Sequence, residues 1–294
     1  MARPARQGSL RSRWSPVEAP LPSQALEVDQ SHPLARGLTG CYVPAFGYGY
    51  SPSGNGGQVY IPDLTGGPTL IDDVGGASTL VNTAIGVAGY GSSFVFGGGW
   101  QASASAAQQA STEASAFCRI IGYGTGGLSS YPMLFGVQYD NANSSPYDAY
   151  TIVQAPNGTD VYLNFQIGGS VSNVSGTGII AAGTVVNLSF SGKAGTANGM
   201  RGFANGSLLG TATPGSGTVT YGANPIICMA GKVQTGGFPS AAVSAGYTWN
   251  RAITDDEQRW LNAEPFAFLR PVRRRLWFPV KPTLITGSGF FFAA

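Results

Sequence analysis

The chain has 294 residues, of which only 10% are charged, and it contains 44 glycines and 11% aromatic residues. This composition is poor in helix formers and rich in residues that suit strands and turns, so it favours one large all-β domain. A net charge of +2 is too small to indicate nucleic-acid binding by the whole chain. The scarcity of charged side chains also leaves few candidates for acid–base catalysis.

The placement of the basic residues and the number of cysteines limit the kinds of site that we expect in this chain. Twelve of the sixteen basic residues lie before residue 37 or after residue 250. Cys41, Cys118 and Cys228 are odd in number and widely spaced, so we expect buried free thiols rather than a zinc site. No apolar run follows the N-terminal arginines, and no apolar stretch is long enough to cross a bilayer. We therefore expect cytoplasmic synthesis without a signal peptide, and no membrane partner.

The N-terminal region lacks the pattern of a folded segment. Residues 1–36 contain five prolines among Arg, Ser and Gln, with no sustained period of 2 or 3.6, which predicts an extended arm or linker. A first strand is expected over residues 38–43. A Gly- and Tyr-rich loop over residues 44–58 follows it.

Short strands at regular intervals predict a sandwich of two antiparallel sheets. The clearest alternation sets Val161, Leu163, Phe165 and Ile167 against intervening polar residues. Residues 100–114 permit a helix by their Ala and Gln content, but their Ser and Thr content favours a loop, which is our prediction. The expected strands are 38–43, 92–96, 116–123, 133–138, 149–154, 161–167, 185–190, 200–204, 208–213, 218–221, 226–230 and one ending at Trp249.

The sandwich is expected to close at residues 243–261. Alternating apolar residues from Val243 to Trp249 predict a strand with one buried face. Thr254 stands three residues before Glu257, the spacing of a capping box, so a helix of about two turns should begin there. Pro265 prevents the helix from running further.

Three short motifs resemble those of laminin-G-like, concanavalin-like jelly rolls of tailed bacteriophages. The closing strand Trp249-Asn250-Arg251-Ala252-Ile253-Thr254 resembles that family's last strand and acidic helical turn. Gly202-Phe203-Ala204-Asn205-Gly206 resembles its hairpin, and Asp63-Leu64-Thr65-Gly66 resembles an early turn. The resemblance implies an all-β, concanavalin-like jelly-roll sandwich with one short C-terminal helix. The sequence Phe-Leu-Arg-Pro followed by Arg-Arg-Arg-x-Trp is similar to tails of phage and prophage proteins.

We therefore divide the chain into an extended Pro/Arg-rich arm (1–36), a jelly-roll domain (37–263) and an Arg/aromatic tail (264–294), so that a chain ending at Ala263 should still fold. Apolar burial alone would not order the tail, because fixing its backbone costs more. Its order requires a partner strand, either at a sheet edge of its own domain or on a neighbouring chain. Anchoring aromatics mixed with arginines are typical of interfaces. The predicted assembly residues are Phe266, Phe268, Leu269, Arg270, Arg273, Arg274, Arg275, Trp277 and Phe278.

Catalytic and metal chemistry find little support. Glycoside hydrolysis needs a carboxylate pair, yet Glu113 is the only Glu between Glu27 and Glu257. His32 is the sole His, and it is read as a surface or capping residue rather than a catalytic one. Asp72-Asp73, and Asp140 with Asn141 and Asn143, are calcium candidates, although solvated turns explain them more simply. No cofactor is expected.

Two binding functions remain open. Residues 46–60 and the group Tyr131, Tyr139, Tyr147 and Tyr150 could stack on sugars. Arg273 to Arg275 could contact phosphate, but carboxylates on a neighbouring protein fit them as well. We expect a non-enzymatic virion structural protein, such as a head decoration, fibre or tail component, that docks on capsid, connector or tail chains and forms a homo-oligomer. The alternative is an adhesion module that binds a host surface glycan.

Overall fold

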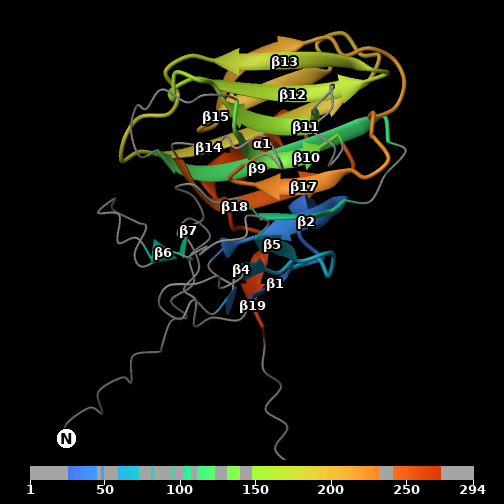
Figure 1. The fold of residues 1–294 in the computed structure, drawn as a ribbon. Helices are drawn as coiled ribbons and strands as arrows, with labels where there is room; N and C mark the ends of the chain where they lie inside the picture. The colour runs from blue at the N-terminus through green and yellow to red at the C-terminus, as the bar shows by residue number, and fades with distance from the viewer. Residues whose placement is uncertain are drawn as a thin grey trace, which may run out of the picture.

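The computed structural model describes residues 26–44, 48–49, 59–72, 81–82, 94–95, 102–106, 111–122, 131–139, 148–231 and 241–272. Two antiparallel sheets pack face to face (Figure 1). The nine-stranded sheet has the order β13 (Ser170–Gly176), β12 (Val161–Ile167), β11 (Asp148–Gln154), β10 (Met133–Gln138), β17 (Ile226–Met229), β8 (Ala102–Ser105), β5 (Leu70–Asp72), β4 (Val59–Ile61) and β3 (Tyr48–Gly49). The six-stranded sheet has the order β16 (Ser207–Ala212), β15 (Met200–Ala204), β14 (Val185–Lys193), β9 (Glu113–Gly122), β18 (Ala241–Trp249) and β2 (Leu38–Tyr42).

Two small ribbons and two short helices complete the described elements. β1 (Leu26–Val28) pairs with β19 (Leu269–Pro271), and β6 (Val81–Asn82) pairs with β7 (Phe94–Val95). A 3-10 helix, η1, spans Pro33–Ala35, and the α-helix α1 spans Asp255–Ala263. None of the helices in the described ranges is long and apolar enough to cross a membrane.

The sheets enclose the main core, and this confirms the predicted sandwich. Leu163 and Phe165 on β12 face Leu188 and Phe190 on β14, and all four side chains are fully buried. The residues between them alternate outward, as the sequence pattern requires. The fold is therefore a concanavalin-like jelly-roll sandwich of two antiparallel sheets with one short C-terminal helix.

Helix α1 lies on the outer face of the six-stranded sheet, over the polar side of β14. Gln258 and Asn262 are buried there, and Ser189 donates from its hydroxyl to Gln258 Oε1 at 3.1 Å. Asn262 Nδ2 donates to Ser189 Oγ at 2.9 Å. Asn187 Nδ2 donates to the Asn262 carbonyl at 2.7 Å. Paired amides and hydroxyls thus hold the helix where an apolar stripe would be expected.

A second core covers the rest of this outer face. Cys41, Phe117, Tyr247 and Trp249 point out of the sheet and are fully buried. Segments from both ends of the described chain cover them, contributing Leu26, Val28, Leu34, Ala35, Ile253, Leu261, Phe266, Phe268 and Leu269. Residues 26–36 and 264–271 therefore pack into the folded body, and the boundaries expected at 36/37 and 263/264 are misplaced. The tail finds its partner strand within its own chain, one of the two options that the sequence left open.

Several element predictions are confirmed and others need correction. The first strand, the hairpin turn at Asn205-Gly206 with φ values of 48° and 80°, and the capped helix are confirmed. Residues 102–105 form a strand instead of a loop, because β17 and β5 supply backbone partners on either side. Around residues 218–221 the structure has only the single bridge between Val219 and Ile167.

The strand β13 was not predicted. It follows a turn in which Gly168 and Gly169 both have positive φ, 56° and 82°, as a two-residue hairpin requires. Its composition of Ser, Asn and Val gives little strand signal, because only Val174 and Gly176 are buried. Pairing with β12 over seven residues determines its conformation.

Candidate functional site

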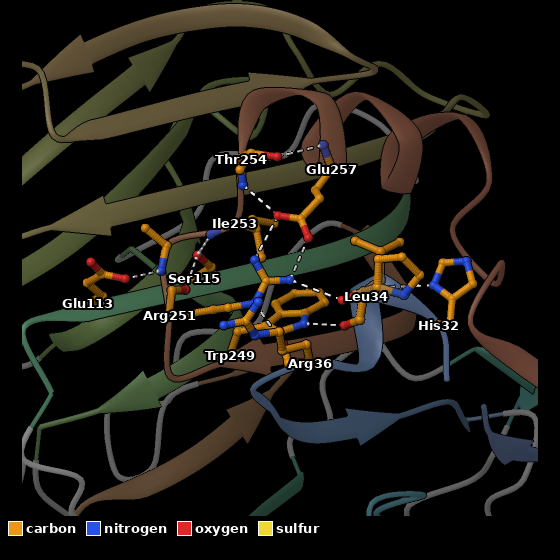
Figure 2. Close-up of polar contacts among 12 residues, drawn as sticks. His32, Leu34, Arg36, Glu113, Ser115, Trp249, Arg251, Ile253, Thr254 and Glu257 are labelled. Carbon is orange, nitrogen blue, oxygen red and sulfur yellow. Dashed lines mark hydrogen bonds and ion pairs between the residues drawn. The ribbon is translucent and has the colours of Figure 1, made fainter. Parts of the chain in front are cut away.

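Side chains at the end of β18 and just after it donate hydrogen bonds to backbone carbonyls of the N-terminal turn at residues 33–36 (Figure 2). Trp249 Nε1 donates to the Leu34 carbonyl at 2.7 Å, and the indole is fully buried. Arg251 Nε donates to the Arg36 carbonyl at 2.7 Å, and its Nη2 donates to the Pro33 carbonyl at 3.3 Å. These bonds join residues more than two hundred positions apart, so they fix the N-terminal segment to the end of the sandwich.

Glu257 links the Arg251 side chain to the N-cap of α1. Both guanidinium nitrogens Nη1 and Nη2 of Arg251 donate to the Glu257 carboxylate at 2.7 Å, a bidentate arrangement. The same carboxylate accepts from the Thr254 amide at 2.8 Å, while Thr254 Oγ1 accepts from the Glu257 amide at 3.2 Å. Partial burial opposes ionisation of Glu257, but the Arg251 guanidinium and the Thr254 amide outweigh it and lower its pKa.

Glu113 and Ser115 hold the intervening residues of the motif. Glu113 Oε2 accepts from the Ala252 amide at 3.0 Å, and its Oε1 lies 3.0 Å from Lys193 Nζ. Partial burial raises the pKa of Glu113, but the Ala252 amide and Lys193 outweigh that effect, so the pKa is lowered. Ser115 Oγ accepts from the Ile253 amide at 3.0 Å and donates to the Arg251 carbonyl at 2.7 Å. The lone Glu113 thus has a structural role in this network.

The β1–β19 ribbon, which we call the anchor, brings the two ends of the described chain together. Leu26 lies opposite Pro271, and Glu27 lies opposite Arg270. Arg270 Nε donates to Glu27 Oε1 at 2.9 Å, and its Nη1 donates to Asp29 Oδ1 at 3.2 Å. Because the two strands are antiparallel neighbours, the start of β1 and the end of β19 lie side by side, at the lower end of the molecule in Figure 1.

Aromatic contacts lock the ribbon onto the sheet. The Phe268 ring meets the Tyr247 ring edge to face, with centroids 4.9 Å apart, and Tyr247 stacks on Phe117 at 5.2 Å. Arg119 lies over the Phe266 ring, 5.6 Å from its centroid. Such pairs add to the stabilisation from buried area. The segment from 266 to 269 is therefore part of the core beneath the anchor.

His32 caps the turn that Trp249 and Arg251 hold. Its Nδ1 accepts from the Leu34 amide at 3.2 Å, and its ring centroid lies 4.5 Å from that of Trp260. This confirms its reading as a capping residue. Burial lowers the pKa of His32, although Asp29 and Glu264 act in the opposite direction. The neutral imidazole is the form that can accept this bond.

The structure separates the predicted assembly residues into three groups. Phe266, Phe268 and Leu269 are at most 1% exposed, so they contact their own core and are not available to another chain. Arg270 is half exposed and paired with acids of β1. The others, Arg273, Arg274, Arg275, Trp277 and Phe278, lie outside the described residues.

The sequence did not identify Arg251 and Glu257 as a clamp. The signal for it was present, because both residues belong to the closing motif and its capping box. Their partners are main-chain carbonyls of residues 33–36, and a carbonyl carries no signature in sequence. The motif residues thus act together in holding the N-terminal segment.

The candidate ligand sites are only partly covered by the structure. Tyr131 is 51% exposed and meets Tyr162 edge to face at 5.8 Å, whereas Tyr150 is buried in the main core. Burial raises the pKa of the Tyr221 hydroxyl beside Tyr150 to about 12. Of the calcium candidates, residues 73, 140, 141 and 143 lie outside the described ranges, as does Tyr147. Within those ranges, no three His, Cys, Asp or Glu residues gather as metal ligands would.

Comparison with known proteins gives likenesses of architecture. No family model matches the chain. No curated protein matches it either. Among solved structures, Trypanosoma rangeli sialidase is 16% identical with a TM-score of 0.48, and the match covers 79% of this chain and 33% of that one.

Two smaller sandwiches are also similar. The CBM40 of Ruminococcus gnavus IT-sialidase bound to α2,3-sialyllactose is 11% identical (TM-score 0.42; 52% of this chain, 83% of that one). The heptameric SAP-like pentraxin of Limulus polyphemus is 16% identical (TM-score 0.36; 52% of this chain, 70% of that one). The chain spans about a third of the sialidase's length. These likenesses concern the β-sandwich alone, which this chain's own sheets already establish.

Proposed function

We propose that the protein is a non-enzymatic structural module that joins a larger assembly through residues 1–25 and 273–294. The observation that carries this proposal is the β1–β19 ribbon, which brings Leu26 and Pro271, near the two ends of the described chain, opposite each other. Two contact segments carried by one chain can act as a bivalent attachment, because binding of one raises the effective concentration of the other.

The charge distribution supports attachment through these segments. Residues 1–25 and 273–294 together carry eight bases and one acid, a net charge of +7, whereas residues 26–272 carry eight bases and thirteen acids, a net charge of −5. The small net charge of the whole chain is therefore the sum of two strongly basic terminal segments and an acidic region between them. Segments of this charge favour an acidic partner surface.

We infer that this partner is a protein surface rich in carboxylates. Arg273, Arg274 and Arg275 are followed by Trp277 and Phe278, and guanidinium forks interleaved with large aromatics suit a protein interface. A virion setting, as head decoration, fibre or tail component on capsid, connector or tail chains, rests on the resemblance of the sequence to phage proteins. The buried Phe266, Phe268 and Leu269 belong to the anchor instead.

Particle incorporation tests the proposal. Gradient-purified particles would be assembled with the full chain, with a chain ending at Val272, or with Arg273→Gln, Arg274→Gln and Arg275→Gln combined. The full chain should co-migrate with particles, and both variants should remain at the top of the gradient while keeping the wild-type unfolding midpoint. Incorporation of the chain ending at Val272 at the wild-type level would refute the role of the C-terminal segment.

A second candidate function is glycan binding, which one observation favours. Tyr131 is 51% exposed and meets the ring of Tyr162, which is partly buried beside Met133 and Val153 of the nine-stranded sheet. An exposed Tyr face with neighbouring polar groups is a suitable platform for a sugar ring. Tyr131→Ala should abolish retention on a host-glycan array without changing the unfolding midpoint, and unaltered retention would exclude this platform.

A further inference from the structure

Among the described strands, β13 forms an edge of the nine-stranded sheet that lacks the usual protection against pairing. β13 pairs with β12 in an uninterrupted register over seven residues, from Ser170 opposite Ile167 to Gly176 opposite Val161, and no described strand pairs with its other side. It contains no charged residue and no proline. Its side chains at 170, 171, 173 and 175 are exposed. Natural edges usually carry charges, prolines or bulges that prevent pairing with another strand.

The other sheet edges are protected in ways that β13 is not. At the edge strand β2, the Asp63 carboxylate accepts from the Cys41 amide at 2.9 Å, and the Leu64 amide donates to the Cys41 carbonyl at 2.9 Å. The far edge of the nine-stranded sheet is β3, which has only two residues. β16 pairs with β15 through a register shift at Gly202 and Phe203. Only β13, among the described edges, is both long and regular.

The surface around β13 has little charge and is partly apolar; the nearest acid is Asp160, whose carboxylate accepts from the Gly178 amide at 2.7 Å beyond the end of β13. Residues 161–192 and 202–231 contain no Asp, Glu, Lys, Arg or His, and they supply β12, β13, β16 and the loops beside them. Val171 on β13 and Leu208 on β16 are 48% and 46% exposed. The strands β13 and β16 contact each other, with Val174 of β13 packed beside Gly210 of β16. A surface with so little charge does not select an oppositely charged partner, and two copies of it repel each other little.

We propose that β13 is a dimerisation edge, on which β13 of a second copy of this chain adds in antiparallel orientation and continues the nine-stranded sheet. An antiparallel edge is self-complementary about a two-fold axis, so the same surface serves on both copies. With the axis near Asn173, Val171 of one copy lies opposite Ser175 of the other on the outer face. These small side chains fit directly opposite one another.

A dimer through β13 would determine where the two β1–β19 anchors lie. β13 and the β1–β19 anchor lie at opposite ends of the molecule (Figure 1). A two-fold dimer through β13 therefore places its two β1–β19 anchors at opposite ends of the dimer. Such a dimer would bridge two binding sites, whereas a monomer would occupy one. The dimer does not depend on the proposed function, because it uses none of the residues in 1–25 or 273–294.

Light scattering of the full chain across a dilution series tests the dimer. Wild type should show twice the chain mass of 30.3 kDa at high concentration. Val171→Lys should shift the mass to the single-chain value, because a lysine on the edge strand is one of the features that prevent edge-to-edge pairing. Val272→Lys is the matched control, since Val272 is 39% exposed at the opposite end, and it should leave the dimer unchanged. A wild-type monomer, or a dimer that persists in Val171→Lys, would overturn the proposal.

A cysteine at the axis gives a second test. Cys41, Cys118 and Cys228 are all buried, so an introduced thiol is the reactive one. Residues opposite each other in an antiparallel pair have Cα atoms about 4.5–5.5 Å apart, within disulfide reach. Asn173→Cys should therefore form a covalent dimer under mild oxidation. If the β13 amides that do not bond to β12 resist hydrogen exchange in a monomer, the chain's own residues cover the edge and the proposal fails.

Discussion

Removing the segment after α1 should unfold the protein, while removing only residues 273–294 should not. A chain ending at Ala263 loses Phe266, Phe268 and Leu269, each at most 1% exposed. Burial of such side chains stabilises by about 1.5–3 kcal/mol each, so the loss amounts to about 5–9 kcal/mol. Domains of this kind have a total stability of about 5–15 kcal/mol. The shortened chain should therefore lose most or all of its cooperative unfolding transition.

Urea unfolding followed by circular dichroism measures this loss. The chain ending at Val272 is the matched control, because it keeps β19 and all three buried side chains. It should retain a cooperative transition close to that of the full chain. In the full-length protein, Phe268→Ala should cost about 3–5 kcal/mol. If the chain ending at Ala263 unfolds at the same urea concentration as the chain ending at Val272, the assignment of these residues to the core is refuted.

The remaining predictions concern the closing network and are tested by the same unfolding measurement. Trp249→Phe should cost about 1–3 kcal/mol, because it leaves the Leu34 carbonyl without its donor. Trp249→Ala should cost about 3–5 kcal/mol through loss of a large core side chain. A wild-type unfolding midpoint in both variants would contradict the stabilising role of Trp249. Thr254→Ala should cost about 1 kcal/mol through the lost cap, and Thr254→Ser should restore most of it. The pKa of His32 is lowered from 6.5, so the unfolded chain takes up that proton first and stability should decline below about pH 6.5, a slope that His32→Gln should remove. The pKa of Glu257 is lowered from 4.5, so its contribution is complete above that pH and should be lost at lower pH; a flat profile from pH 7 to 3 would disprove both.

The sequence determined the elements whose signal is local. Alternation over Val161 to Ile167 predicted a half-buried strand, because side chains alternate between the two faces of a sheet. The spacing of Thr254 and Glu257 predicted the helix start, because a capping box needs only four consecutive residues. The scarcity of carboxylates argued against glycoside hydrolysis, which needs a carboxylate pair, and so favoured a structural or binding role.

Only the tertiary structure decided which terminal residues belong to the body. Leu26, Val28 and Leu34 lie in a Pro-rich region, and their burial depends on Trp249 and Phe268, more than two hundred residues away. Phe266 and Phe268 were predicted to form an interface with another chain, yet they pack on the outer face of their own sheet. Short strands such as β1 and β13 gain their conformation from a neighbouring strand, since three to seven residues carry too little intrinsic preference. Pairing between distant segments therefore formed the β1–β19 ribbon. The same pairing pattern puts β13 at an edge, where no described strand pairs with its outer side.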